Sequence, residues 1–244
     1  MNPVIALATA RRVLAQLRHD RRTLAMALVV PTLLMVLLRF VFDEEAAFDA
    51  VAPALLGLLP FLVMFLITSV STLRERTSGT LERLLTLPTA KLDLLLGYAL
   101  AFSLVCLVQV ALAVAVSLSW LGLDITGPLW MLFLVAALDA LLGTALGLLV
   151  SAFARTEFQA VQFMPAVVLP QVLLCGLFTP RDQMASFLDY LSDVLPLSYA
   201  VDAMTELSRH TGIGADLVAQ VSVISAALLL SLVLGAATLR RQTA

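Results

Sequence analysis

Six long apolar runs constrain the fold of this chain more than any other feature of its sequence. Each run is long enough to cross about 30 Å of hydrocarbon as a helix that rises about 1.5 Å per residue. The runs are continuous and do not alternate apolar with polar residues, as the strands of a membrane β-barrel would. The chain is 61% hydrophobic and 13% charged, so a water-soluble core could not hide its apolar surface. We therefore predict an all-α integral membrane protein, a single domain over residues 1–244, with transmembrane helices at residues 23–42, 53–73, 92–121, 128–153, 158–178 and 216–239.

Basic residues indicate the orientation of these helices. Arginine and lysine gather before the first run, between runs two and three, and at the C-terminus, whereas the other side carries Arg181 and Arg209 only. Because cytoplasmic connections are enriched in basic residues, we predict that both termini are cytoplasmic and that the chain is a multi-pass protein of a prokaryotic inner or plasma membrane. Arg39 lies near the outer end of the first helix, where we expect it to reach the acidic residues 43–45.

Two segments outside the spans also have helical patterns. Residues 1–22 place apolar side chains among arginines, which predicts an amphipathic helix at the inner membrane interface; a merely solvated basic anchor is the alternative. Residues 180–208 predict two short extracellular helices. In this prediction Thr179 caps the first helix, Pro196 ends it and Ser198 caps the second.

The sequence lacks the motifs of several common catalytic and binding sites. The chain has no phosphate-binding Gly-x-x-x-x-Gly-Lys-Ser/Thr loop, and its two histidines, His19 and His210, fall on opposite predicted sides. Cys106 and Cys175 lie inside apolar runs, where we interpret them as buried small hydrophobic residues. A net charge of −2 argues against a nucleic-acid partner. We predict a non-enzymatic chain without catalytic, metal or cofactor ligands, whose surroundings are membrane lipid.

Polar residues inside the spans are candidates for a transport path. Asp139 is the one acid deep within a span, and it predicts either a proton or substrate site or a structural acid hydrogen-bonded near Thr144. The fifth run combines two glutamines with two prolines, a composition that favours a kinked, mobile wall of a path; these residues are Gln162, Pro165, Pro170 and Gln171. Gly143 and Gly147 form a Gly-x-x-x-Gly step whose default meaning is close helix packing.

The connection after the second run is the most informative stretch. Residues 75–87 have an apolar side rich in leucine and a charged side, and Pro88 follows them. This pattern predicts a short cytoplasmic amphipathic helix that could dock a partner protein.

The same stretch resembles the cytoplasmic motif of the ABC-2 type permease family, in which Arg-Glu is followed by Gly-Thr-Leu-Glu, a leucine pair and a proline. The matching residues are Arg74, Glu75, Gly79, Thr80, Leu81, Glu82, Leu84, Leu85 and Pro88. A second likeness covers residues 175–180, Met184, residues 195–199 and Asp202, although Cys175 replaces the usual serine and the aromatic residue is displaced by one position.

This resemblance implies a mechanism. Two permease copies, identical or sister chains, would pair with two cytoplasmic ATPase subunits that bind ATP and Mg²⁺. Residues 75–87 would be the coupling helix in a groove of the ATPase, and we expect Glu75, Glu82 and Arg83 to orient the docking. The second and fifth spans would line the path, and residues 178–199 would form its outer lid, which includes Phe178, Pro180, Pro196 and Tyr199.

The likeness is greatest to drug and antibiotic efflux permeases related to daunorubicin resistance, which implies export of a hydrophobic or amphipathic substrate. Export of a lipid or a lipid-linked glycan is an alternative within the family. An ion-coupled secondary transporter that uses Asp139 and an intramembrane enzyme are the alternatives outside it.

Overall fold

The computed structural model describes residues 3–42, 44–78 and 91–238 of the chain. Within these ranges the regular structure is helical, and none of the described residues forms a strand. The elements are α1 (Pro3–His19), α2 (Arg21–Val41), α3 (Glu45–Thr77), α5 (Lys91–Ser119), α6 (Leu129–Ser151), α7 (Glu157–Leu174), the 3-10 helix η1 (Arg181–Gln183), α8 (Ser186–Val194), α9 (Pro196–Arg209) and α10 (Ala215–Thr238).

Six of the described helices are long and apolar enough to cross a membrane: α2, α3, α5, α6, α7 and α10. They correspond to the six predicted runs, which confirms the prediction of a multi-pass, all-α membrane protein. The clearest difference in bounds is in α3, which begins at Glu45 and not near residue 53, so that Pro53 lies within the helix. Proline is tolerated in a membrane helix where neighbouring helices satisfy the freed backbone groups.

The pair α3 and α6 forms the centre of the bundle. Gly143 and Gly147 on α6 lie against the backbone of α3, where a Cβ atom would collide with the carbonyl oxygens of Phe61 and Phe65. The predicted role of this Gly-x-x-x-Gly step in close packing is confirmed. Because glycine has no side chain, the two backbones can approach closely at these positions. The hydrophobic effect does not drive helices together in lipid, so this close van der Waals contact stabilises the pair instead.

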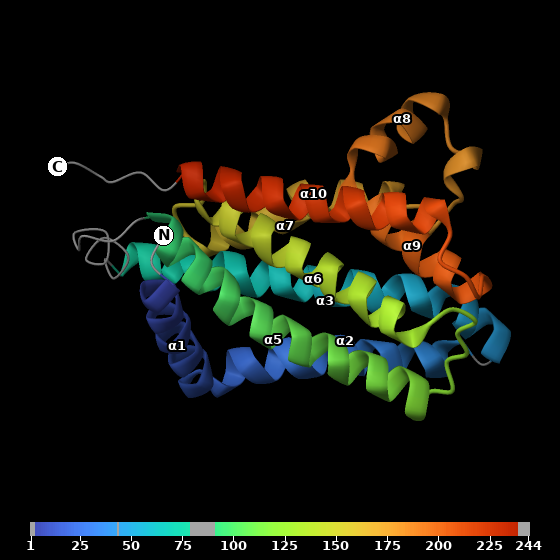
Figure 1. The fold of residues 1–244 in the computed structure, drawn as a ribbon, viewed down its shortest axis with the longest axis horizontal. Coiled ribbons are helices and arrows are strands. Elements are labelled where there is room, and N and C mark those ends of the chain that lie inside the picture. The colour runs from blue at the N-terminus through green and yellow to red at the C-terminus, as the bar shows by residue number, and fades with distance from the viewer. Residues whose placement is uncertain (1–2, 43, 79–90, 239–244) are drawn as a thin grey trace.

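The remaining spans surround this pair. In Figure 1 the start of α1 and the end of α10 lie at the same end of the bundle, and α1 lies across that end at a steep angle to the other helices. α1 packs on α5, where Gly97 leaves room for Thr9. Large apolar side chains on α2, α7 and α10 are exposed, as expected of helices that face lipid or a second chain.

The opposite end carries η1, α8 and α9, and it departs from the prediction. α9 begins at Pro196, which occupies the first helical turn, so Ser198 lies inside the helix and does not cap it. Proline suits this position because the first helical amides have no partner within the helix. Thr179 does not cap a helix either, since Pro180 precedes η1 and Ala185 precedes α8. α9 is also deeper than a surface helix: Leu197, Ala203 and Met204 are fully buried, and it packs on α3, α6 and α10.

Arg39 joins two helices near this end. Its guanidinium lies 3.2 Å from the carboxylate of Glu45 and donates to the carbonyl of Leu121 at 3.1 Å. The expected reach of Arg39 toward this acidic segment is confirmed for Glu45.

Candidate functional site: the charged end of α3

The last turn of α3 directs consecutive charged side chains toward different neighbours. Successive residues on an α-helix are about 100° apart around its axis, so Arg74, Glu75 and Arg76 cannot share one face. α3 continues without interruption to Thr77, with Ser78 as its C-terminal cap. Residues 75–77 therefore belong to the same helix as the second span, which corrects the prediction that a separate helix begins at residue 75.

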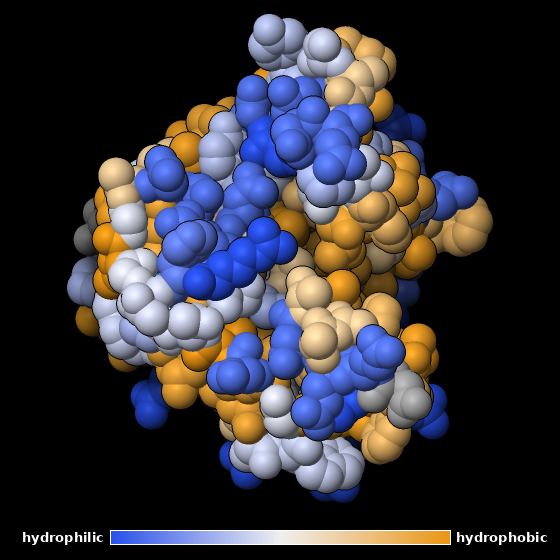
Figure 2. Space-filling model, turned by 90° about the vertical axis from the view of Figure 1, so that its right-hand side faces the viewer, coloured by the Kyte–Doolittle hydropathy of each residue, from blue (hydrophilic) through white to orange (hydrophobic). Residues whose placement is uncertain are grey.

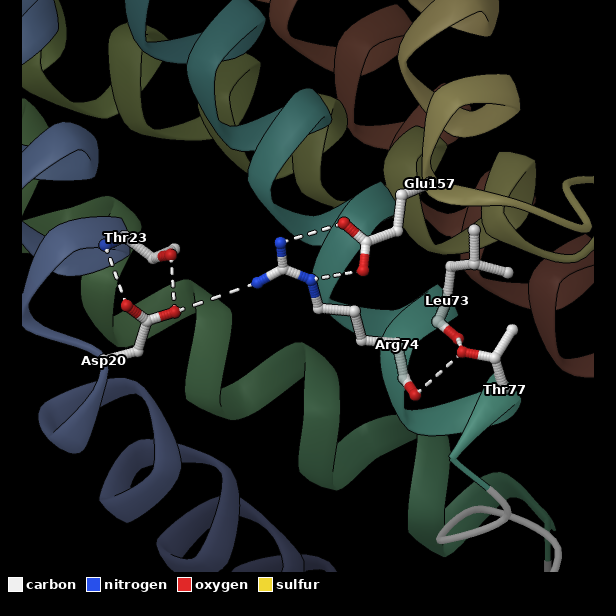
Figure 3. Close-up of polar contacts among 6 residues, drawn as sticks. All are labelled: Asp20, Thr23, Leu73, Arg74, Thr77 and Glu157. Atoms are coloured by element: carbon white, nitrogen blue, oxygen red, sulfur yellow. Dashed lines mark hydrogen bonds and ion pairs between the residues drawn. The ribbon is translucent and has the colours of Figure 1, made fainter.

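Arg74 connects α3 with α7 and with the start of α2. Its Nε and Nη2 atoms donate to the two carboxylate oxygens of Glu157 at 2.8 and 2.9 Å, a bidentate pair, and its Nη1 lies 4.0 Å from Asp20 Oδ2 (Figure 3). Glu157 is the first residue of α7, and Asp20 is the N-cap of α2. The Arg74 side chain is 52% exposed, so this contact is open to solvent.

Asp20 is held by its own helix as well as by Arg74. Its carboxylate accepts from the Thr23 backbone amide at 3.2 Å and from the Thr23 hydroxyl at 2.6 Å (Figure 3). These hydrogen bonds from Thr23, assisted by the nearby charge of Arg74, lower the pKa of Asp20 below its ordinary value. Asp20 is therefore a charged acceptor at neutral pH.

Glu75 connects α3 with α1 and α5. Its carboxylate accepts from Arg12 Nη2 at 3.0 Å and from the hydroxyl of Tyr98. Arg12 also donates to the Tyr98 hydroxyl at 2.8 Å, and its guanidinium lies 5.6 Å from the centre of the Tyr98 ring. The Glu75 side chain is only 15% exposed, so this contact is more enclosed than the one at Arg74.

Arg76 completes the set, because its Nη1 donates to the backbone carbonyl of Ser151 at the end of α6 at 3.0 Å. We call the group formed by Arg12, Asp20, Arg74, Glu75, Arg76, Tyr98 and Glu157 the α3-end cluster. Three consecutive residues of one helix thus contact α1, α2, α5, α6 and α7. A displacement of the end of α3 must move these helices with it or break these contacts.

The remaining predicted coupling residues lie outside the described residues: Gly79, Thr80, Leu81, Glu82, Arg83, Leu84, Leu85 and Pro88. The structure places the α3-end cluster directly before this segment in the chain.

The predicted path residues on α7 do not share one face. Gln162, Pro165 and Pro170 are exposed, whereas Gln171 is buried and donates from its amide to the carbonyl of Val167 at 3.1 Å. Residues 51–73 of α3 are buried or only partly exposed in one copy of the chain. The outward side of α7 is therefore more available to a second copy than any side of α3.

Two of the predicted lid residues, Pro180 and Tyr199, lie beside Arg181. The Tyr199 hydroxyl donates to the carbonyl of Asp193 at 2.8 Å, and the guanidinium of Arg181 lies 5.8 Å from the centre of the Tyr199 ring. Phe178 is 68% exposed, and Pro180 borders a hollow beside α9.

Comparison with known proteins decides the family. The sequence model of the family described as "ABC-2 type transporter" matches residues 4–207, which is more than half of the chain. The chain belongs to the ABC-2 type transporter family.

Two kinds of relative illustrate the breadth of this family. "ABC transporter G family member 20" of Dictyostelium discoideum is 28% identical over 159 residues, which are 65% of this chain and 22% of the relative. "Probable multidrug ABC transporter permease YbhR" of Escherichia coli K12 is 26% identical over 157 residues, 64% of this chain and 43% of the relative. "Probable multidrug ABC transporter permease YbhS" of Escherichia coli K12 is 27% identical over 158 residues, 64% of this chain and 42% of the relative. The matches thus span less than half of each of these relatives.

Sequence reasoning about this ABC-2 chain missed the partners within the α3-end cluster. In the sequence Arg12 is one of several basic residues before the first span, and Asp20, Tyr98 and Glu157 belong to no recognisable motif. The signal that could have found them is charge complementarity between helix ends on one predicted side, since the start of α7 and the end of α3 were both placed there.

Asp139 lies at the centre of the bundle of this ABC-2 chain. Its side chain is fully buried, and a Cβ atom on Gly57 of α3 would lie 3.4 Å from its Oδ2. Neither carboxylate oxygen has a hydrogen-bond partner among the described residues, and Thr144 donates instead to the carbonyl of Ala140 at 3.1 Å. The predicted hydrogen bond near Thr144 is therefore wrong, because the hydroxyl turns back onto its own helix.

The described residues contain no group of three or more histidine, cysteine or acidic side chains that could hold a metal ion. Cys106 and Cys175 are buried and unpaired with each other, which agrees with their interpretation as small hydrophobic residues.

Proposed function

We propose that this chain is the membrane-spanning permease of an exporter that moves an amphipathic or hydrophobic substrate outward, driven by ATP hydrolysis on a separate cytoplasmic ATPase. The observation that carries the proposal is the α3-end cluster. It lies directly before the segment that resembles a coupling helix, and it connects the end of α3 with the surrounding helices. Membership of the ABC-2 type transporter family supports the same conclusion.

The coupling we propose begins outside the membrane helices. Closure of two ATPase subunits around ATP and Mg²⁺ displaces residues 79–88, and α3 follows because it is continuous with that segment. Arg74 passes the displacement to α7 through Glu157, and Glu75 passes it to α1 and α5. This is rigid-body coupling through a docked segment and a packed helix, and the exposed ion pairs that transmit it contribute little to the stability of either arrangement.

This coupling fixes the orientation that we propose. The α3-end cluster, α1 and both termini face the cytoplasm, and α1 lies at the inner interface with its basic side chains toward the headgroups. α8 and α9 then lie toward the outside. Two permease copies, identical or sister chains, enclose the path, which is bordered by the exposed side of α7 with Gln162, Pro165 and Pro170.

The substrate that we propose is a drug-like amphipathic molecule, because two bacterial relatives, YbhR and YbhS, are described as probable multidrug permeases. Export of a lipid or a lipid-linked glycan would use the same coupling and would differ only in the path between the two copies.

Co-purification tests the proposal directly. The chain should co-purify with the ABC ATPase encoded beside its gene, and substrate should stimulate ATP hydrolysis in the reconstituted complex. Glu82→Arg should abolish co-purification or stimulation, whereas Asp124→Asn, at the opposite end of the bundle, should leave both unchanged. Stimulation that persists in Glu82→Arg would contradict the proposed docking.

Asp139 offers the alternative of ion-coupled transport, since it is a buried acid without a hydrogen-bond partner among the described residues. Asp139→Asn keeps the shape of the side chain and removes its capacity to carry a proton. The ATP-driven proposal expects transport by this variant to stay within about twofold of the wild type. Loss of a pH-gradient-driven flux in Asp139→Asn would favour the alternative.

A further inference from the structure

A hollow of about 460 Å³ opens at the end of the bundle that carries η1, α8 and α9. Its lining is dominated by charged side chains: Arg181, Asp182, Asp189, Asp202 and Arg209. The size lies within the range of about 300–1,000 Å³ that is typical of small-molecule sites.

Two of these charges neutralise each other. Arg181 forms ion pairs with Asp193 and, at 2.7 Å, with Asp202. Burial raises the pKa of Asp202 above its ordinary value, and the charge of Arg181 opposes that shift. The charge of Arg181 is therefore already paired with carboxylates of the protein, so Arg181 is a weak partner for a charged ligand.

The other three charges remain uncompensated. The side chains of Asp182, Asp189 and Arg209 form no hydrogen bond or ion pair with any described residue; Asp182 and Arg209 are exposed and Asp189 is half-buried. One hollow thus presents two free carboxylates and one free guanidinium. A simple cation would leave the charge of Arg209 unpaired, and a simple anion would be repelled by two unpaired carboxylates. A zwitterion carries both charges and can pair with Arg209 and with the carboxylates.

The surface beside the hollow is apolar. α8 exposes Phe187, Tyr190 and Val194 to 69%, 73% and 76%. Figure 2 shows hydrophilic patches separated by apolar surface at this end of the molecule. A short helix that exposes aromatic and aliphatic side chains next to charged ones is typical of the membrane interface, where one part of a ligand is apolar and the other is hydrated.

We propose that this hollow binds the headgroup of a zwitterionic phospholipid that carries a primary ammonium group, as phosphatidylethanolamine does. The ammonium pairs with Asp182 and Asp189, the phosphate pairs with Arg209, and the acyl chains lie along the apolar side of α8. A primary ammonium donates three hydrogen bonds, whereas a trimethylammonium donates none, so the site should prefer ethanolamine to choline headgroups. The inference depends on the membrane location of the chain and not on its proposed export function.

Lipid retention tests the site. The purified chain in detergent is exposed to an equimolar mixture of phosphatidylethanolamine, phosphatidylcholine and phosphatidylglycerol, and bound lipid is measured by native mass spectrometry. We expect phosphatidylethanolamine to be retained about tenfold more than either competitor, the change that about 1.4 kcal/mol of preference produces. The double variant Asp182→Asn/Asp189→Asn should lose this preference, and Arg209→Gln should reduce retention of ethanolamine lipid without raising that of choline lipid.

Asp124→Asn is the matched control, because Asp124 is an exposed acid at the same end of the bundle but outside the hollow. Its lipid retention should equal that of the wild type. Unfolding midpoints of all variants in detergent report whether they stay folded, and we expect no shift because the replaced side chains form no ion pairs. Equal retention of the three lipids, preference for phosphatidylglycerol, or an unchanged preference in the double aspartate variant would overturn the proposal.

Discussion

The two ends of this bundle both contain one arginine between two carboxylates, but they use it differently. Arg74 contacts Asp20 and Glu157, which belong to two other helices far away in the sequence, and its side chain is 52% exposed. Arg181 contacts Asp193 and Asp202, which follow it closely in the chain, and its side chain is 17% exposed.

The difference separates a contact suited to movement from one suited to rigidity. An exposed ion pair contributes about 0–1 kcal/mol, so the pairs of Arg74 do not hold the helices strongly in any single arrangement during the proposed transport cycle. A more enclosed pair leaves a desolvated charge behind when one partner is removed, so Arg181 holds η1, α8 and α9 in one arrangement. The first end should therefore govern function and the second should govern local stability.

The largest expected effect is on transport, at Arg74. Arg74→Glu places a negative charge beside both Asp20 and Glu157, and we expect ATP-driven transport to fall at least tenfold while the free energy of unfolding changes by less than about 1 kcal/mol. The double variant Arg74→Glu/Glu157→Arg re-forms the pair and should recover much of the rate. Transport assays in proteoliposomes and denaturant titrations measure the two effects. If Arg74→Glu lowered the free energy of unfolding as well as the transport rate, the proposed difference between the two ends would be contradicted.

Removal of Arg181 should have the largest effect on stability. Arg181→Ala leaves the partly buried Asp202 carboxylate without its partner, and we expect the free energy of unfolding to fall by about 2 kcal/mol. Asp202→Asn in the same background should restore part of the loss because no charge is then stranded. Chemical unfolding in detergent measures both variants, and a cost no greater than that of Arg74→Ala would contradict the assignment of rigidity to this end.

A smaller effect is expected at Gly176, which precedes η1 with a φ angle of +89°. Gly176→Ala should destabilise the chain by about 1 kcal/mol, because a side chain disfavours this left-handed backbone conformation. Gly212→Ala is the control, since a Cβ atom there would meet no atom within 4 Å and its backbone needs no glycine. A larger loss of unfolding free energy in Gly176→Ala than in Gly212→Ala would support the conclusion that the backbone before η1 is held in one conformation.

The smallest effect is expected at Asp20 and depends on pH. The lowered pKa of Asp20 means that its ionised form stabilises the fold above the ordinary carboxyl pKa and that this contribution is lost as the pH falls through the folded pKa. Asp20→Ala should cost about 1 kcal/mol at pH 7, the usual value of a helix cap, and the difference from wild type should shrink below about pH 4. Asp20→Asn keeps the cap without the charge, so a full loss in that variant would point to the contact with Arg74.

Much of the fold was predictable because lipid imposes a simple rule on sequence. Every backbone group must be satisfied within the helix, so each span appears as one continuous apolar run, and the six runs correspond to α2, α3, α5, α6, α7 and α10. The packing of Gly143 and Gly147 was predictable for the same reason, since only small residues let backbones approach.

The contacts between charged residues were not predictable in the same way. Arg74 contacts Glu157 only because the end of α3 lies beside the start of α7, a relation that no local pattern specifies. Ser198 failed as a predicted cap because Pro196 already fits the first helical turn, so α9 begins three residues earlier than a Ser198 cap would place it. The buried and unpaired state of Asp139 depends on the packing of α3 against α6, which a single run of residues does not reveal.

The most direct test of the central claim is substrate transport in proteoliposomes that contain the chain with its ABC ATPase, either active or with a catalytic substitution that abolishes ATP hydrolysis. We predict ATP-dependent transport with the active ATPase and no transport above background with the inactive one. Transport that continues with the inactive ATPase, or in the absence of any ATPase, would contradict the account.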